Sequence, residues 1–264
     1  GEAACLHAAR YVLLNNRGAI APGYLADFAI VEDLKDFHVV TVYKKGRRVY
    51  HNGQVADFPQ PQIPEHLDAL AHNTFHLPVL QPRDFADSRP RGIIGMVPGQ
   101  IITEDKGYAQ QPDVEKDILK MAVIERHKNT HHIGIGYLSG YGLKAGAVAT
   151  SVAHDSHNII CVGTNDEDMA FAANRVAENR GGIVVVSGCK VLSELSLEIA
   201  GLMSDRPLTE VNRLLEDAKE AAYALGVGKD IDPFMTLSFM SLPVIPQVRL
   251  TTRGVVDVLT QQYI

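Results

Sequence analysis

The pattern that most constrains the fold is a unit of two strand-like runs followed by an amphipathic helix, which recurs from residue 92 onward. The first unit comprises residues 93–103 and an expected helix at 112–128, the second comprises runs within 132–162 and a helix from Thr164, and the third comprises residues 182–200 and a helix from Pro207. No residue-by-residue repeat accompanies it, so the repetition is architectural. We therefore predict an α+β fold with mostly antiparallel sheets covered by helices.

A small antiparallel β element is expected before these units. Strand-like residues occur at 27–31 and 38–43, after a Pro22-Gly23 turn. The dipeptides Lys45-Gly46 and Asn52-Gly53 are typical of tight hairpin turns, because glycine adopts a positive φ without steric cost.

We divide the 264 residues into three parts. Residues 1–56 carry an expected helix at 3–14 and the small β element, residues 57–91 form a proline-rich connecting segment, and residues 92–264 form the large α+β domain. The chain has no initiator methionine and begins within a helical pattern. We interpret it as a fragment of a longer protein.

Composition argues against several partners. The net charge of −6, the aromatic content of 6% and the absence of tryptophan disfavour a nucleic-acid partner. No apolar run reaches the length of a membrane span, and the N-terminus does not resemble a secretory signal. Three cysteines (Cys5, Cys161 and Cys189) without a CxxC motif, in apolar surroundings, favour a reducing cytoplasm.

The clearest polar cluster is the segment HDSHN, which lies between two apolar runs. It contains His154, Asp155, His157 and Asn158. As a metal site it is disfavoured, because residues i and i+3 of a strand point to opposite sides and a structural zinc site needs four ligands. We expect a polar turn between two strands.

Two interpretations of this turn remain open. Polar side chains on a loop held by a sheet are well placed to bind a ligand, so His154, Asp155, His157 and Asn158 could line or close a pocket. Alternatively, Asp155 and Asn158 bond the backbone of their own turn while the histidines pack at an interface.

Other polar motifs have plainer explanations. GYLSGYG (136–142) resembles a phosphate-binding loop, but a strand rather than a helix follows it. The three carboxylates at 166–168 suit a helix N-terminus, where the helix dipole favours negative charge. Cys189 beside Lys190 lacks a neighbouring histidine, so we expect a buried or idle thiol.

Two stretches carry a family resemblance. In NNRGAIAPGYLADFAIVEDL, the pattern Gly18, Ile20, Gly23, Ala26 and Asp27 resembles the point where amidohydrolases leave their catalytic barrel and return to a small β-domain. The longer string from HHIGIG to FAANRV (131–176) resembles the C-terminal domain of the adenine deaminase family. The N-terminal Ala-Cys-Leu-His departs from the Ala-Thr-x-Asn-type stretch usual there.

The resemblance implies the hydrolysis of adenine to hypoxanthine and ammonia, with a divalent metal, manganese or iron rather than zinc, activating the water. The metal ligands are expected in a barrel that this chain lacks, so the chain alone is expected to be inactive. The chain would cover the barrel and support the pocket or the assembly of a homo-oligomer, with a dimer as the default expectation. The alternatives are a structural or oligomerisation module, or part of another amidohydrolase that acts on a cyclic amide or amine.

Overall fold

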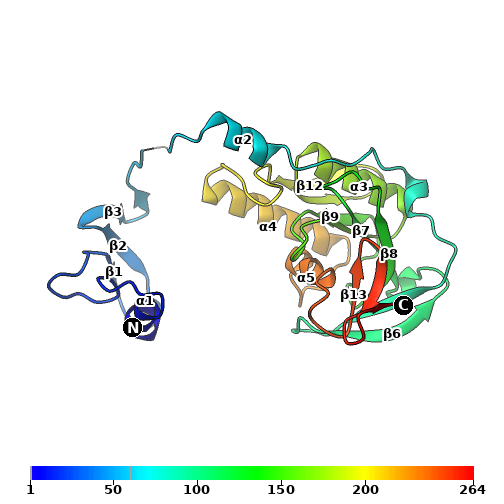
Figure 1. The fold of residues 1–264 in the computed structure, drawn as a ribbon, viewed down its shortest axis with the longest axis horizontal. Helices are drawn as coiled ribbons and strands as arrows, with labels where there is room; N and C mark the ends of the chain where they lie inside the picture. The colour runs from blue at the N-terminus through cyan, green and yellow to red at the C-terminus, as the bar shows by residue number, and fades with distance from the viewer. Residues whose placement is uncertain (1, 60) are drawn as a thin grey trace. The chain divides into compact units, whose positions relative to one another are not determined.

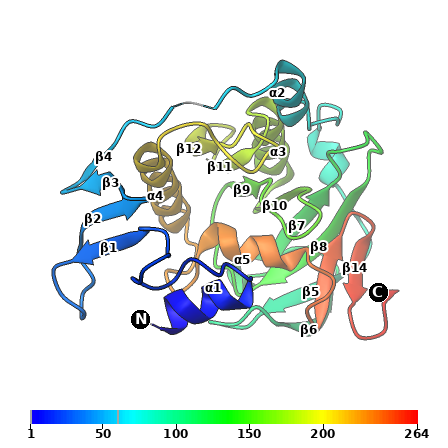
Figure 2. The same ribbon diagram turned by 60° about the vertical axis from the view of Figure 1, so that its left-hand side comes forward.

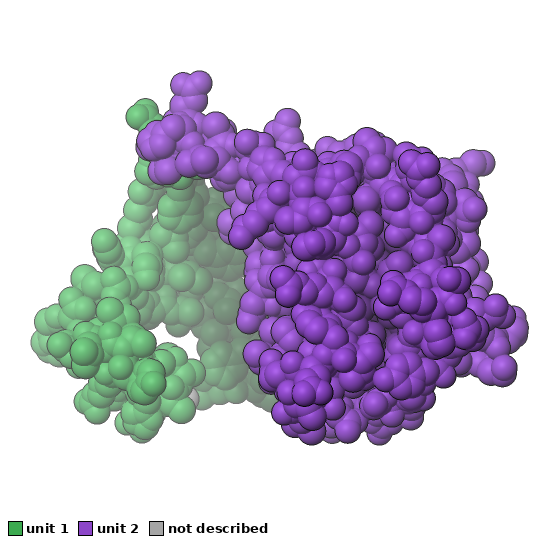
Figure 3. Space-filling model, turned by 45° about the vertical axis from the view of Figure 1, so that its right-hand side comes forward, with its two compact units in different colours: residues 1–63 green, residues 64–264 purple. Residues whose placement is uncertain are grey.

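The computed structural model describes residues 2–59 and 61–264, which form two compact units. Unit 1 comprises Gly1–Ile63 and unit 2 comprises Pro64–Ile264 (Figure 3). Each unit is described by itself.

Unit 1 contains two short helical segments and one antiparallel sheet (Figure 1). A π-helical turn, η1 (Ala3–His7), continues into α1 (Ala8–Tyr11), and the sheet has the order β1 (Phe28–Val31), β2 (Val39–Lys44), β3 (Arg47–His51), β4 (Gln54–Val55). Lys45, Gly46, Asn52 and Gly53 all have positive φ, which confirms both predicted hairpin turns. Asp27 fixes the first hairpin by accepting the Lys45 amide at 2.6 Å.

Unit 2 is built on an eight-stranded sheet with the order β12-β11-β9-β10-β7-β8-β5-β6. Its strands are β5 (Arg91–Met96), β6 (Thr103–Ala109), β7 (Leu119–Ile124), β8 (Ile133–Ser139), β9 (Ala147–Thr150), β10 (Ile159–Gly163), β11 (Gly182–Val186) and β12 (Val191–Ser196). Every pair of neighbours is antiparallel except β5 and β8, which are parallel. The predicted fold class is confirmed.

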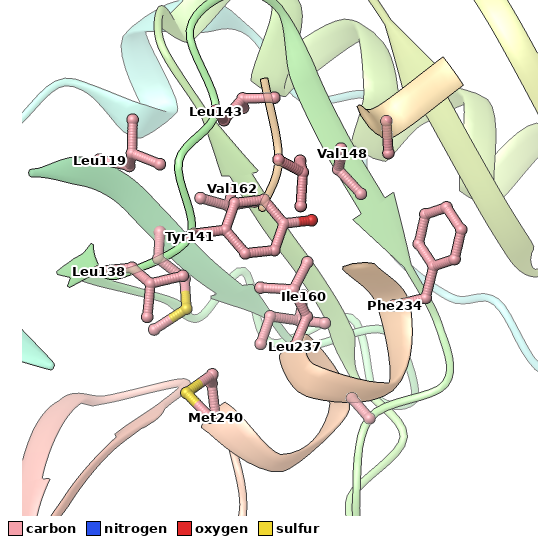
Figure 4. Packing of buried hydrophobic residues seen from close by; sticks show 14 of the residues in the cluster. Leu119, Leu138, Tyr141, Leu143, Val148, Ile160, Val162, Phe234, Leu237 and Met240 are labelled. Carbon is pink, nitrogen blue, oxygen red and sulfur yellow. The ribbon is translucent and has the colours of Figure 1, made fainter. Parts of the chain in front are cut away.

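Both faces of this sheet are covered (Figures 1 and 2). On one face lie α4 (Leu208–Ala224), α5 (Pro233–Met240) and a small sheet of β13 (Val248–Thr251), β14 (Gly254–Asp257) and β15 (Gln262–Tyr263). Figure 4 shows Phe234, Leu237 and Met240 of α5 packing in this core. The other face carries α3 (Asp166–Glu178) and the segment that holds the 3-10 helix η2 (Pro82–Phe85).

The expected helix at 112–128 is wrong. The segment forms a 3-10 turn, η3 (Val114–Lys116), and then strand β7, all six residues of which are buried. A strand buried on both faces has a nearly continuous apolar run, and such a run also satisfies a helical stripe.

Two helices were not expected from the sequence. The connecting segment contains α2 (Glu65–His72), which has no buried residue. The mixed tail contains α5, where Asp232 accepts the amides of Phe234 and Met235 and Pro233 occupies the first turn. A capping carboxylate followed by proline is a helix-start signal, so the start of α5 was readable in the sequence. None of the helices in the described residues is long and apolar enough to cross a membrane.

Candidate functional site

The HDSHN segment forms the predicted turn between two central strands of unit 2. It follows β9 and precedes β10, both of which are buried. His157 has a φ of 50°, in the left-handed region, and its amide donates to the Ala153 carbonyl at 2.6 Å. The polar segment therefore reverses the chain at one end of the sheet.

Helix α5 holds the first half of the turn. The His154 amide donates to the Ser238 carbonyl at 2.9 Å, and the Ser241 hydroxyl donates to the His154 carbonyl at 3.3 Å. The His154 ring lies against Phe239, with ring centroids 4.8 Å apart. These contacts fix both the backbone and the ring of His154.

The loop after β7 holds the second half. Arg126 Nε donates to the His157 carbonyl at 2.6 Å. His127 Nε2 lies 2.8 Å from the Ser156 carbonyl, and because a carbonyl only accepts, this nitrogen carries the proton. The turn backbone is therefore fixed by groups about 30 residues away in the chain.

Arg126 also ties this turn to two further segments. Its Nη1 donates to the Thr74 carbonyl at 2.8 Å and its Nη2 donates to the Ala200 carbonyl at 2.9 Å. The guanidinium is almost fully buried over the Phe75 ring, 4.2 Å from its centroid. Burial lowers the pKa of Arg126 to about 10, so it remains charged at neutral pH.

Glu125 organises the loop that carries these two side chains. Its carboxylate accepts the amides of Lys128 at 2.9 Å and Thr130 at 3.1 Å, as well as the His127 amide. Burial raises the pKa of this carboxyl, but the hydrogen bonds from Thr130, His127 and Lys128 outweigh it and lower the pKa to about 2. The consecutive residues Glu125, Arg126 and His127 thus form one support for the turn.

The four predicted site residues lie together but differ in exposure. Asp155 is exposed, His154 and His157 are half-buried, and Asn158 is buried. Among the described residues, His157 Nδ1 and Asn158 Oδ1 are buried without a hydrogen-bond partner. Burial, followed by the neighbouring His154 imidazole and Arg126 guanidinium, lowers the pKa of His157, which favours its neutral form at pH 7.

This arrangement does not suit a metal. The described residues contain no group of three or more His, Cys, Asp or Glu side chains that could hold a metal ion. The ring centroids of His154 and His157 are 6.2 Å apart, and the two rings are arranged edge-to-face. A rigid backbone that presents imidazole, carboxylate and amide groups is instead suited to hydrogen bonding.

The other polar motifs serve the fold. In the glycine loop, the amides of Gly140 and Gly142 donate to the Asp117 carboxylate at 2.6 and 2.8 Å, so a protein carboxylate occupies the place of an anion. Asp166 pairs with Lys120, and the buried Asp168 accepts the Cys189 amide at 2.7 Å.

The thiol of Cys189 is exposed rather than buried, because residues 188–189 form a tight surface turn with positive φ. Cys5 is also exposed, whereas Cys161 is buried and its pKa is raised by burial and by the nearby Asp168.

Comparisons with known proteins match two separate stretches of the chain to known families. Residues 99–262 match the family model described as the adenine deaminase C-terminal domain. The chain belongs to the adenine deaminase C-terminal domain family. Residues 2–49 match the amidohydrolase family.

Curated adenine deaminases resemble the whole chain. It is 43% identical to "Adenine deaminase" of Nitratidesulfovibrio vulgaris strain DP4 over 97% of its length, and 43% identical to "Adenine deaminase 2" of Carboxydothermus hydrogenoformans over 98%. The "Adenine deaminase" of Lysinibacillus sphaericus is 40% identical over 100% of the chain. The chain spans about half the length of these relatives, 46% or 47% of each.

Within this family domain, the sequence predicts the HDSHN turn but not the side chains that hold its backbone, Arg126 and His127. The run Glu125-Arg126-His127 directly after a buried strand was a signal, because ionisable residues at a strand end often organise the adjoining loops. Nothing local in the sequence links this run to HDSHN.

Proposed function

We propose that this chain is the C-terminal portion of an adenine deaminase, which converts adenine and water to hypoxanthine and ammonia. The observation that carries this proposal is the match of residues 99–262 to the family domain, together with about 43% identity to curated adenine deaminases across the chain. The amidohydrolase match at residues 2–49 supports a catalytic portion upstream of this chain.

Ammonia release from adenine by the full-length protein tests this proposal. We expect turnover of adenine, and no turnover by the 264-residue chain alone. Turnover of another cyclic amide or amine instead of adenine would assign the protein to a different amidohydrolase.

In the proposed enzyme, a divalent metal supplies the means of activating water at neutral pH. The described residues of this chain do not fit a metal, so we place the ligands in the upstream portion. Manganese or iron is favoured over zinc. Metal analysis of the full-length protein tests this: stoichiometric manganese or iron is expected, and stoichiometric zinc would contradict the choice of metal.

The HDSHN turn is proposed to support the adenine pocket. Its backbone is fixed by contacts from α5 and the loop after β7. Asp155 is exposed, and among the described residues His157 Nδ1 and Asn158 Oδ1 have no hydrogen-bond partner. A purine presents several donors and acceptors to such groups.

Alanine substitution of His154 and Asp155 in the full-length enzyme tests this role. We expect kcat/KM for adenine to fall by roughly tenfold or more for at least one variant, the loss expected for a hydrogen bond of about 1.4 kcal/mol. Unchanged kcat/KM with weakened subunit assembly would instead make the domain a structural or oligomerisation module. Mass measurement of the native protein tests the homo-oligomer, for which we expect a dimer.

A further inference from the structure

The surface of unit 2 beside the HDSHN turn is unusually poor in charge. Residues 233–248 contain no charged side chain. They form α5 and the connection to β13. A stretch of this length in a surface helix and loop would ordinarily carry several charges.

Helix α5 is apolar on both sides. Phe234, Leu237 and Met240 point into the core (Figure 4). On the other side Met235 is 52% exposed, and Phe239, which packs partly against the core, is half-buried. A helix that is apolar all round is normally buried in the complete protein.

A second exposed apolar segment lies beside the connection between α5 and β13. Ile101 and Ile102, in the loop between β5 and β6, are 50% and 42% exposed. Arg249 Nη2 donates to the Ile101 carbonyl at 2.6 Å, and the Thr103 amide donates to the Pro246 carbonyl at 3.1 Å. These bonds hold the loop against the α5–β13 connection. We name the exposed apolar residues Ile101, Ile102, Met235 and Val244, together with the half-buried Phe239, the α5 face.

We propose that the α5 face docks against the part of the complete enzyme that lies upstream of this chain and thereby directs the HDSHN turn toward the catalytic portion. This inference rests on the proposed function. His154 belongs to the same surface, because its backbone bonds Ser238 and Ser241 and its ring contacts Phe239. Docking of the α5 face therefore determines what the turn side chains meet.

The comparisons and the covalent linkage of the chain indicate which surface covers the α5 face. The relatives are about twice as long as this chain, and its residues 2–49 already match the amidohydrolase family. A part of the same polypeptide is held near the α5 face at a high effective concentration. It is therefore favoured over a second copy of the protein as the partner of this face.

Cysteine labelling of the full-length protein tests this docking. Val244→Cys and Met235→Cys are probed with a maleimide, and modification of each site is followed by peptide mass spectrometry. The matched control is Val79→Cys. Val79 is 75% exposed, against 69% for Val244, and it lies in the segment that covers the opposite face of the sheet.

We expect both α5-face sites to react at least about tenfold more slowly than the control, since a docked surface reacts only after local opening. Equal rates at all three sites would overturn the proposal. Protection that disappears when the protein is diluted to single subunits would overturn it in favour of a second copy. An adenine assay on the same unlabelled protein tests the proposed function separately, because labelling does not depend on turnover.

Discussion

At the scale of single residues, the turn is governed by side chains outside it. Arg126 bonds the His157 carbonyl and anchors two further segments, so its guanidinium fixes the backbone that carries the His157 ring. Arg249 is an internal control. It is also fully buried, bonds only carbonyls, and has its pKa lowered to about 10 by burial.

We predict that Arg126→Lys and Arg249→Lys each lower the free energy of unfolding by about 1–3 kcal/mol, the usual loss for hydrogen bonds to a charged group. Only Arg126→Lys should also shift the His157 ring resonances in NMR spectra, assigned with His157→Gln. If both variants leave the His157 resonances unchanged, Arg126 does not position the turn.

The lowered pKa of Glu125 predicts that the stability of the fold depends on pH. Its pKa is about 2 in the folded protein, below the ordinary value of 4.5, so it stabilises the fold fully above pH 4.5. This contribution is lost as the pH falls from 4.5 toward 2. The difference in melting temperature between the wild type and Glu125→Gln should therefore be largest at pH 6 and shrink by pH 3. The exposed helix residue Glu220 provides the control substitution, Glu220→Gln. A difference in melting temperature between the wild type and Glu125→Gln that stays constant with pH would contradict the prediction.

At the scale of elements, the parts that the sequence predicted correctly are those with local signals. The turns at Lys45-Gly46 and Asn52-Gly53 and the start of α3 at Asn165 depend on a few adjacent residues. The sequence of β7 wrongly predicts a helix. Its burial on both faces is decided by α3 on one face and by the α5 core on the other, and both lie far away in the chain. Likewise HDSHN was recognisable as a turn, whereas its support by Arg126 is a contact over 31 residues.

The start of α3 gives an element-scale prediction. Asn165 Oδ1 accepts the Asp168 amide at 2.7 Å, and its Nδ2 donates to the Asp168 carboxylate at 2.9 Å. Asn165→Ala removes the cap and should cost about 1 kcal/mol or more in denaturant unfolding. Asn165→Ser retains a capping oxygen and should recover part of the loss. Equal destabilisation by both variants would show that the cap oxygen is not what stabilises α3.

At the scale of the whole molecule, the two units differ in how much core they possess. In unit 1, only Ala9 and Thr41 are buried among the described residues, while Tyr11, Leu13 and Ile20 are 89%, 78% and 88% exposed. Unit 2 has continuous cores on both faces of its large sheet. Since apolar burial is the main favourable contribution to folding, unit 2 has most of the stability of the chain.

Hydrogen exchange of the 264-residue chain measures this difference directly. We predict that amides of β2 and β3 exchange at least about 100-fold faster than those of β7 and β10, because a unit with little core opens without unfolding its neighbour. All residues of β7 and β10 are buried, so their amides should exchange only through global unfolding of unit 2. Equal protection in the two sheets would show that unit 1 is stabilised by more than its own contacts. The proposed function predicts slow exchange in β2 and β3 of the full-length protein instead, because the proposed upstream portion would cover the apolar side chains that unit 1 exposes.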